Sequence, residues 1–167
     1  MAAFKVIHSQ NADSCYRQDE PKYHDSDALS TVITYCCAPE KTKSGYIGGF
    51  GINIHDAAEQ MESLARAYYK ADGIRLRHMI LSFESWEKIT PFMAFQIAYQ
   101  AAWYYGSSYQ ILFAVHENTT HPHIHFVMNT VSYLDGHKYA GKRQDYYNFQ
   151  QHLRNVLWPY GIELKIA

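Results

Sequence analysis

The feature that most constrains the fold is a segment in which four histidines fall within ten residues, 116–125. Within residues 122–133 (PHIHFVMNTVSY), which begin inside this segment, His123 and His125 alternate with apolar residues. Side chains two apart on a β-strand point to the same face of the sheet. A strand here therefore places both imidazoles on one face and apolar side chains on the other. The apolar run 109–115 predicts a preceding strand, and the short connection makes the two antiparallel neighbours.

The rest of the chain predicts helices and strands in the order β, α, α, β, α, β, β, α, β. Further strands are predicted at 3–8, 74–83 and 162–166. Helices are predicted from Ser26 or Asp27 to Pro39, from Asn53 or Asp56 to Gly73, from Thr90 to Gly106, and around 144–157. The polar stretch to about Asp25 is interpreted as a loop, and glycine-rich 43–52 as a surface loop, a hairpin or a lid.

This order predicts an α+β fold, with one antiparallel sheet of about five strands and helices packed on it. With 167 residues and no repeat or linker, the chain is expected to form a single domain over 1–167. No apolar run approaches the length of a membrane span, and the first residues do not resemble a signal peptide. Three cysteines, Cys15, Cys36 and Cys37, do not make a disulfide framework and fit a reducing cytoplasm.

The chain has 15 tyrosines, 10 histidines and a net charge of −1, so its overall charge does not indicate nucleic-acid binding. Most of the tyrosines are expected to pack in half-buried positions. Others are candidates for stacking on unpaired bases or for a nucleophile.

The histidines themselves predict a metal site. His116 ends one predicted strand where His123 and His125 begin the next, so three imidazoles converge on one point. As simple packing residues, neighbouring imidazoles would lose hydration without a partner. The remaining candidates are His121, as a further ligand, and the carboxylates that could orient an imidazole, Glu84 and Glu117.

Beyond this geometry, residues 116–139 (HENTTHPHIHFVMNTVSYLDGHKY) resemble the metal motif of MobA/MobL and Vir-type relaxases, which are HUH endonucleases. An upstream histidine, His-Pro-His-x-His and then Asn129 follow the family's order. Residues 78–90 (HMILSFESWEKIT) resemble the family's central strand and the start of its next helix. Residues 28–35 (ALSTVITY), followed by PEKT at 39–42, resemble its first motif. The resemblance covers about 28–165.

The resemblance implies that Tyr35 is a nucleophile that nicks single-stranded DNA at an origin of transfer and stays linked to the 5′ phosphate. It implies Mg²⁺ or Mn²⁺ at the histidines, although three imidazoles also suit Zn²⁺, Ni²⁺ or Co²⁺ in vitro. It further implies accessory relaxosome proteins and a role in conjugative mobilisation of a plasmid or integrative element, hence in horizontal gene transfer. Two departures are Asn118, where many members have aspartate, and the polar insertion before residue 25. Without a helicase or partner-binding region, the sequence is interpreted as a nuclease domain or a small stand-alone member.

DNA binding is expected from local basic residues, first Lys138, Lys142 and Arg143 in a loop beside the metal strand, and Lys41. Tyr139, Tyr146 and Tyr147 are candidates for base stacking.

Three alternatives stay open. A histidine-triad nucleotide hydrolase would use His123 as nucleophile without metal. A rolling-circle initiator would use Tyr146 or Tyr147, although Phe149 and Gln150 stand where its lysine is expected. A metal-stabilised DNA-binding module would have no activity. Within the relaxase interpretation, Tyr16 and Tyr46 are further candidates for the nucleophile.

Overall fold

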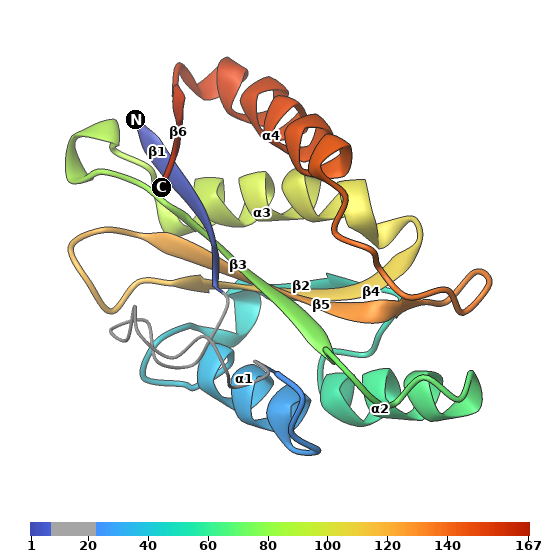
Figure 1. Cartoon of the computed structure of the whole chain (residues 1–167). Helices are drawn as coiled ribbons and strands as arrows, with labels where there is room; N and C mark the ends of the chain where they lie inside the picture. Colours follow the sequence, from blue (N-terminus) through green and yellow to red (C-terminus); the bar gives the residue numbers. More distant parts are fainter. Residues whose placement is uncertain (8–22) are drawn as a thin grey trace, which may run out of the picture.

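A computed structural model describes residues 1–7 and 23–167 of the chain, as one sheet with helices on both faces (Figure 1). The predictions for Tyr16, Cys15 and most of the polar stretch before residue 25 lie outside these residues. The strands are β1 (Ala2–Ile7), β2 (Ile47–Phe50), β3 (Leu76–Ser82), β4 (Tyr109–His116), β5 (His123–Ser132) and β6 (Leu164–Ile166). The helices are α1 (Ala28–Cys36), α2 (Ala57–Ala67), α3 (Pro91–Gly106) and α4 (Arg143–Leu157).

The sheet has the order β2-β4-β5-β3-β1-β6. All neighbours are antiparallel except β1 and β6, which run parallel and join the two ends of the chain. The α+β class and the single sheet are confirmed. The sheet has six strands where about five were predicted, and the β1–β6 pair makes it mixed.

The additional strand is β2, in the glycine-rich segment that was interpreted as a surface loop, a hairpin or a lid. It pairs with β4 at the edge of the sheet, and Gly48 lies opposite Phe113. A Cβ atom on Gly48 would lie 2.6 Å from the Phe113 ring, and one on Gly49 would lie 2.8 Å from the Ile111 carbonyl oxygen. The two glycines thus permit a close approach to β4, although glycine is depleted in strands in general.

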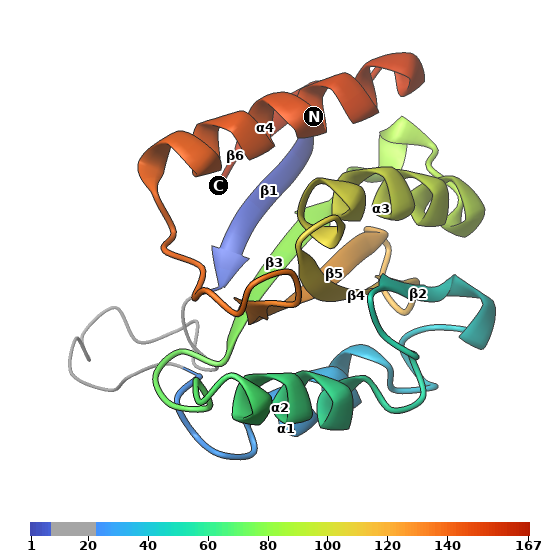
Figure 2. The ribbon, with the colours of Figure 1, turned by 90° about the vertical axis from the view of Figure 1, so that its right-hand side faces the viewer.

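The helices form two layers that sandwich the sheet. Helices α3 and α4 cover one face and α1 and α2 cover the other (Figure 2). Strand β5 sends Ile124, Phe126 and Met128 into the α3/α4 core and Val127 into the α1/α2 core. The central strands β4 and β5 are consequently buried on both faces.

The ends of the helices follow the predicted signals in part. Thr90 caps α3, accepting a hydrogen bond from the Met93 backbone N–H, and Pro91 is the first helical residue. Asp27 and Asp56 precede α1 and α2, but neither side chain makes a capping hydrogen bond. Helix α2 ends at Ala67 and does not reach Gly73, because Tyr69 adopts a left-handed conformation (φ 56°).

Candidate metal and nucleophile site

The antiparallel pairing of β4 with β5 brings three predicted ligands together. His116 lies directly opposite His123, and His125 lies opposite Ala114. The ring centroids of His116 and His125 are 4.1 Å apart, and His123 lies 5.1 Å from each. One ring nitrogen from each histidine lies within 4.8 Å of the other two. All three imidazoles lie on the side of the sheet covered by α1.

Each of these imidazoles has one nitrogen engaged in a hydrogen bond. His116 Nε2 donates to the Cys36 carbonyl oxygen (2.8 Å), and His123 Nδ1 donates to the His121 carbonyl oxygen (3.0 Å). His125 Nδ1 lies 2.8 Å from His78 Nε2. The nitrogens left for a ligand are Nδ1 of His116 and Nε2 of His123 and His125.

The residues present fit a metal ion. His125 Nε2 is buried and has no hydrogen-bond partner. Buried polar atoms almost always have a partner, so an orphaned nitrogen beside two further imidazoles indicates that a ligand completes the site. Three neutral imidazoles with open positions suit a divalent transition metal.

Burial keeps the imidazoles of His116 and His125 neutral. Desolvation lowers the pKa of His116 to about 4, and its neighbours His123 and Lys41 add to the effect, against the hydrogen bond to Cys36. Desolvation also holds the pKa of His125 far below its ordinary range, reinforced by the surrounding histidines. A neutral imidazole is the form that binds a metal, so neither residue needs to lose a proton near neutral pH.

Tyr35, the predicted nucleophile, lies in the last turn of α1 beside the histidines. Its ring centroid is 6.0 Å from that of His116 and 5.8 Å from that of His125. The side chain is 49% exposed, so solvent or a substrate can reach it. Lys41 Nζ lies 3.5 Å from the centre of the Tyr35 ring, in a cation–π contact.

The PEKT turn holds Lys41 in this position. The Lys41 and Thr42 backbone N–H groups both donate to the Ala38 carbonyl oxygen. The Lys41 carbonyl oxygen in turn accepts from the Glu117 N–H (3.0 Å), which ties the turn to the residue after β4. The turn therefore couples the end of α1 to the strand end that carries His116.

Four further predicted residues, His121, Glu84, Glu117 and Asn129, lie apart from the three imidazoles. The His121 ring lies 3.7 Å from the Glu84 carboxylate, and Glu117 forms an ion pair with Lys43 at 3.1 Å. Asn129 is buried farther along β5, where its side-chain N–H groups donate to the Met61 carbonyl oxygen and to Gln110. These contacts give each residue a partner outside the histidine site.

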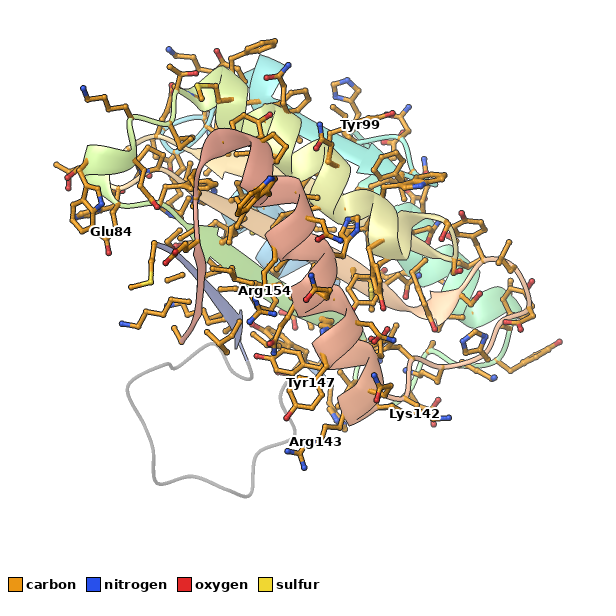
Figure 3. The ribbon with its side chains drawn as sticks, turned by 90° about the horizontal axis from the view of Figure 1, so that it is seen from above. Glu84, Tyr99, Lys142, Arg143, Tyr147 and Arg154 are labelled. Atoms are coloured by element: carbon orange, nitrogen blue, oxygen red, sulfur yellow. The ribbon has the colours of Figure 1, made fainter. Side chains whose placement is uncertain are left out.

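Two of the predicted DNA-binding residues, Lys138 and Lys142, lie in the loop at the opposite end of β5 from His123. Lys138 Nζ donates to the carbonyl oxygens of Asp72 and Ile74, both at 2.8 Å. Lys142 is exposed at the start of α4, and the neighbouring Arg143 donates to the Tyr147 hydroxyl (2.9 Å; Figure 3). Lys138 therefore supports the fold locally, whereas Lys142 and Arg143 face outward.

The alternative nucleophiles within the described residues, Tyr46, Tyr146 and Tyr147, lie on the other face of the sheet. Tyr46 packs against Phe95 of α3, with ring centroids 6.2 Å apart. Tyr146 packs against Phe4 at 6.2 Å, and Tyr147 lies beside Tyr146 on α4. Of the described tyrosines that were predicted as nucleophiles, Tyr35 is the one beside the histidines.

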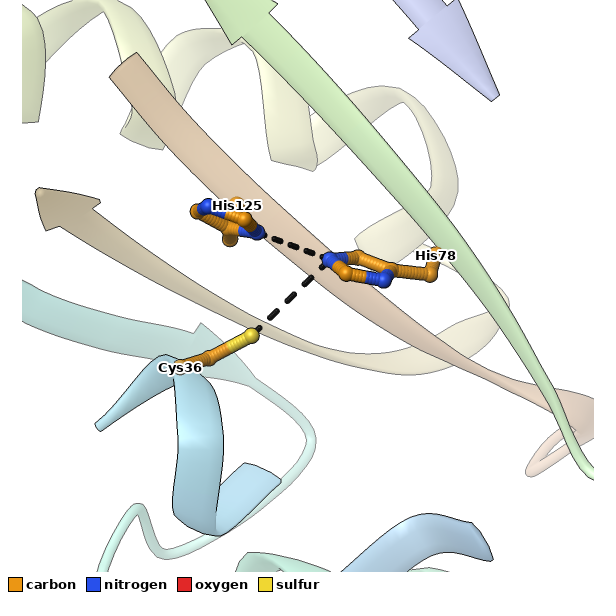
Figure 4. Close-up of side chains that lie close together, drawn as sticks. All are labelled: Cys36, His78 and His125. Atoms are coloured by element: carbon orange, nitrogen blue, oxygen red, sulfur yellow. Dashed lines mark hydrogen bonds between the residues drawn. The ribbon is translucent and has the colours of Figure 1, made fainter. Parts of the chain in front are cut away.

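Sequence reasoning missed two residues behind the three imidazoles, His78 on β3 and Tyr23 before α1. His78 Nδ1 lies 3.2 Å from the Tyr23 hydroxyl, and Cys36 Sγ lies 3.9 Å from His78 Nε2 (Figure 4). Desolvation lowers the pKa of His78 to about 4. The available signal was a histidine inside the apolar strand run 76–82.

A second cluster lies on the α3/α4 face, near a cavity of about 410 Å³. Its centre is the Asp145 carboxylate, which accepts hydrogen bonds from the hydroxyls of Tyr104 (3.0 Å), Tyr105 (2.9 Å) and Tyr139 (2.6 Å). Burial, aided by Asp145, raises the pKa of Tyr139 to about 12. These tyrosines are donors in a closed network, which disfavours a role as nucleophiles.

Two comparisons with known proteins show which sequences this chain is similar to. A family model described as relaxase, MobA/VirD2-like, nuclease domain matches residues 35–162. The protein rlx of Staphylococcus aureus is 24% identical over 143 residues, which is 86% of this chain and 44% of that relative. The chain thus spans less than half the length of this relative. Among the helices that the structure describes, none is long and apolar enough to cross a membrane.

Proposed function

Since the chain belongs to the MobA/VirD2-like relaxase nuclease-domain family, we propose that it nicks single-stranded DNA with Tyr35 as the nucleophile. Membership of this family identifies the chain as a relaxase-type nuclease. The proposal adds the residues, the metal dependence and the covalent mechanism. We further propose that residues 1–167 form a single nuclease domain that acts in the cytoplasm.

The observation that carries the proposal is the position of Tyr35. Its ring lies about 6 Å from His116 and His125, the two imidazoles that are closest to each other. A phosphate held at the histidines would therefore lie within reach of the tyrosine hydroxyl, as an in-line attack requires. The half-exposed ring also leaves room for a DNA strand.

The proposed reaction is a transesterification. The Tyr35 hydroxyl loses its proton to a base or to water and attacks the phosphorus atom. The bond from phosphorus to the 3′ oxygen breaks, and that oxygen leaves and takes up a proton. The 5′ phosphate remains joined to Tyr35 as an ester. Because the phosphotyrosine ester retains the free energy of the phosphodiester bond that was broken, attack by a free 3′ hydroxyl on its phosphorus releases Tyr35 and reseals the strand.

His116, His123 and His125 would hold the metal, Mg²⁺ or Mn²⁺ by family likeness, with Zn²⁺, Ni²⁺ or Co²⁺ as substitutes in vitro. A divalent ion bound there supplies positive charge that offsets the charge on the phosphate oxygens. Lys41 adds a fixed cation beside Tyr35, within reach of the same phosphate. Lys142 and Arg143 are proposed to contact the DNA backbone farther away.

The proposed substrate is single-stranded DNA at an origin of transfer, with accessory relaxosome proteins as partners. The biological role would be mobilisation of a plasmid or an integrative element. These parts of the proposal come from the family and the S. aureus relative, of which the chain spans less than half.

A nicking assay tests the proposal. Labelled single-stranded oligonucleotides that tile the DNA beside the gene are incubated with Mn²⁺ or with EDTA. We expect a protein–DNA adduct that survives SDS, requires metal, disappears in Tyr35→Phe and persists in the matched control Tyr46→Phe.

Other outcomes would redirect or overturn the proposal. An adduct that persists in Tyr35→Phe would move the nucleophile to Tyr46, Tyr146 or Tyr147. Binding without any adduct would favour the DNA-binding module. Metal-independent hydrolysis of nucleoside phosphoramidates, with no adduct on any DNA, would favour the histidine-triad hydrolase.

A further inference from the structure

We propose that His78 and Tyr23 are positioning residues that hold His125 in its metal-binding form. His78 would accept a hydrogen bond from His125 Nδ1–H, and Tyr23 would in turn fix His78. The inference rests on the proposed function, since it takes His116, His123 and His125 as the metal ligands.

The position of the proton on His125 decides which ring nitrogen can bind a metal. A neutral imidazole carries one N–H, either on Nδ1 or on Nε2. With the proton on Nδ1, His125 donates to His78 Nε2 at 2.8 Å, and the lone pair of Nε2 is free. With the proton on Nε2, a donor would be buried without an acceptor, because that atom has no partner. The geometry therefore favours the form in which Nε2 can bind a metal.

His78 lies between His125 and Tyr23 and contacts each through one ring nitrogen. If its Nε2 accepts from His125, its own proton sits on Nδ1, which lies 3.2 Å from the Tyr23 hydroxyl oxygen. His78 Nδ1–H can donate to that oxygen. The result is a directed chain from His125 to His78 to Tyr23, in which the N–H of each imidazole has an acceptor.

Tyr23 is held tightly in position. The residue is buried and adopts a left-handed backbone conformation (φ 63°), which is uncommon for a bulky residue. Its carbonyl oxygen accepts from the Arg75 N–H at 2.9 Å, which ties it to the chain just before β3. Such a conformation persists only where the surroundings determine it, and here it delivers the hydroxyl to His78.

A competing interpretation is a second metal site formed by Cys36, His78 and His125, whose ligand atoms lie within 4.8 Å of one another (Figure 4). Two imidazole nitrogens on a tetrahedral zinc ion would be about 3.3 Å apart, given the usual Zn–N bond length. The observed 2.8 Å is the length of a hydrogen bond.

The test is a Mn²⁺ titration of the metal-stripped protein by calorimetry, without DNA. His78→Phe keeps an aromatic ring and removes both nitrogens, and we expect it to weaken Mn²⁺ binding about 10- to 100-fold. His78→Gln keeps an acceptor oxygen, and we expect it to restore affinity to within about threefold of the parent. Tyr23→Phe removes one hydroxyl, and we expect an intermediate loss of about 3- to 10-fold.

Thermal unfolding of the metal-stripped variants separates positioning from folding. A variant with an unchanged unfolding midpoint and weaker Mn²⁺ binding supports the proposal. If His78→Phe does not fold, the Tyr23→Phe result decides the matter. Mn²⁺ affinity that is unchanged in the folded variants would overturn the proposal.

Two controls separate this inference from the proposed function. His125→Ala should abolish Mn²⁺ binding, and parent protein that binds no Mn²⁺ would overturn both proposals. Weaker binding in His78→Phe, together with a parent that never nicks DNA, would support the positioning role and reject the proposed nicking activity. A thiolate-to-cobalt absorption band that disappears in Cys36→Ser would establish the second metal site and reject the positioning role.

Discussion

Two clusters of polar side chains lie on opposite faces of the same sheet, and they differ in how completely their atoms are paired. On the α3/α4 face, three tyrosine hydroxyls converge on the Asp145 carboxylate, and each has its acceptor. On the α1/α2 face, three imidazoles converge while His125 Nε2 remains buried and unpaired.

The difference separates a structural network from a binding site. A closed network of hydrogen bonds stabilises the fold, and removing its centre leaves several buried donors without acceptors. The unpaired ring nitrogens of the histidine cluster add no stability on their own. Burial removes water from them, and the free energy that this costs is regained only when a ligand binds. The tyrosine cluster should therefore control stability, and the histidine cluster should control activity.

The largest expected effect is on activity, from His123→Ala. Loss of a metal ligand should reduce metal-dependent nicking by at least about 1000-fold, or about 4 kcal/mol in the barrier. The unfolding midpoint without metal should change by no more than about 2 °C, because His123 is only half-buried.

The matched control is His121→Ala, which removes a neighbouring histidine that faces Glu84. It should nick at nearly the rate of the parent protein. Equal loss in both variants would mean that the histidine segment acts as a unit and not through three specific ligands.

The next effect should be on stability, from Asp145→Ala. Three tyrosine hydroxyls would lose their acceptor, and we expect the free energy of unfolding to fall by about 2–4 kcal/mol. Nicking measured well below the unfolding midpoint should be unchanged. Denaturant unfolding measures the first quantity, and a nicking defect without loss of stability would place the tyrosine cluster in the DNA-binding surface.

A smaller effect should follow from pH. Burial lowers the pKa of His78 and His116 to about 4, whereas histidine in an unfolded chain titrates near about 6.5. Between these values the unfolded chain binds more protons, so stability is highest above pH of about 6.5 and is lost as the pH falls toward about 4. We expect the midpoint of the metal-free protein to drop by about 5 °C from pH of about 7 to about 5.

His78→Phe should reduce this pH dependence, since it removes one of the three histidines whose pKa is lowered in the folded protein, His78, His116 and His125. The tyrosine cluster should contribute no such dependence through its hydroxyls, because the pKa of Tyr104 and of Tyr139 is raised to about 12. A pH dependence that is unchanged in His78→Phe would show that other groups titrate on unfolding.

The three histidines could be predicted to lie together from the sequence, because side chains alternate between the two faces of a strand. His123 and His125 share a face in any strand, and His116 joins them as soon as the adjacent run pairs as an antiparallel neighbour. Helix α3 was predictable for a similar reason, since Thr90 and Pro91 form a local start signal. Local patterns carry this information without knowledge of the rest of the fold.

The parts that were missed depend on contacts between distant segments. Gly48 and Gly49 have low strand propensity, and only pairing with β4 makes them a strand. The parallel β1–β6 pair joins the two ends of the chain, which no local pattern encodes. The role of His78 depends on Tyr23, 55 residues earlier.

The smallest expected effects come from Lys41 and Lys138, which were both predicted to contact DNA. One lies beside the histidine cluster, and the other is bound to backbone carbonyl oxygens far from it. Lys41 lies over Tyr35 at the histidine site, whereas Lys138 donates to the backbone carbonyls of Asp72 and Ile74 at the far end of β5. Lys41→Ala should weaken single-stranded DNA binding a few-fold and reduce the slope of log affinity against log salt by about 0.7.

Lys138→Met should leave DNA affinity and its salt slope unchanged and should lower the unfolding midpoint, because the two carbonyl oxygens lose their donor. Fluorescence anisotropy with a labelled oligonucleotide at several salt concentrations measures both slopes. A reduced slope in Lys138→Met would mean that its ammonium group reaches a phosphate in the complex. The residues at the far end of β5 would then contact DNA. Lys138 would bind the substrate in addition to stabilising the fold, and the contrast between Lys41 and Lys138 would not hold.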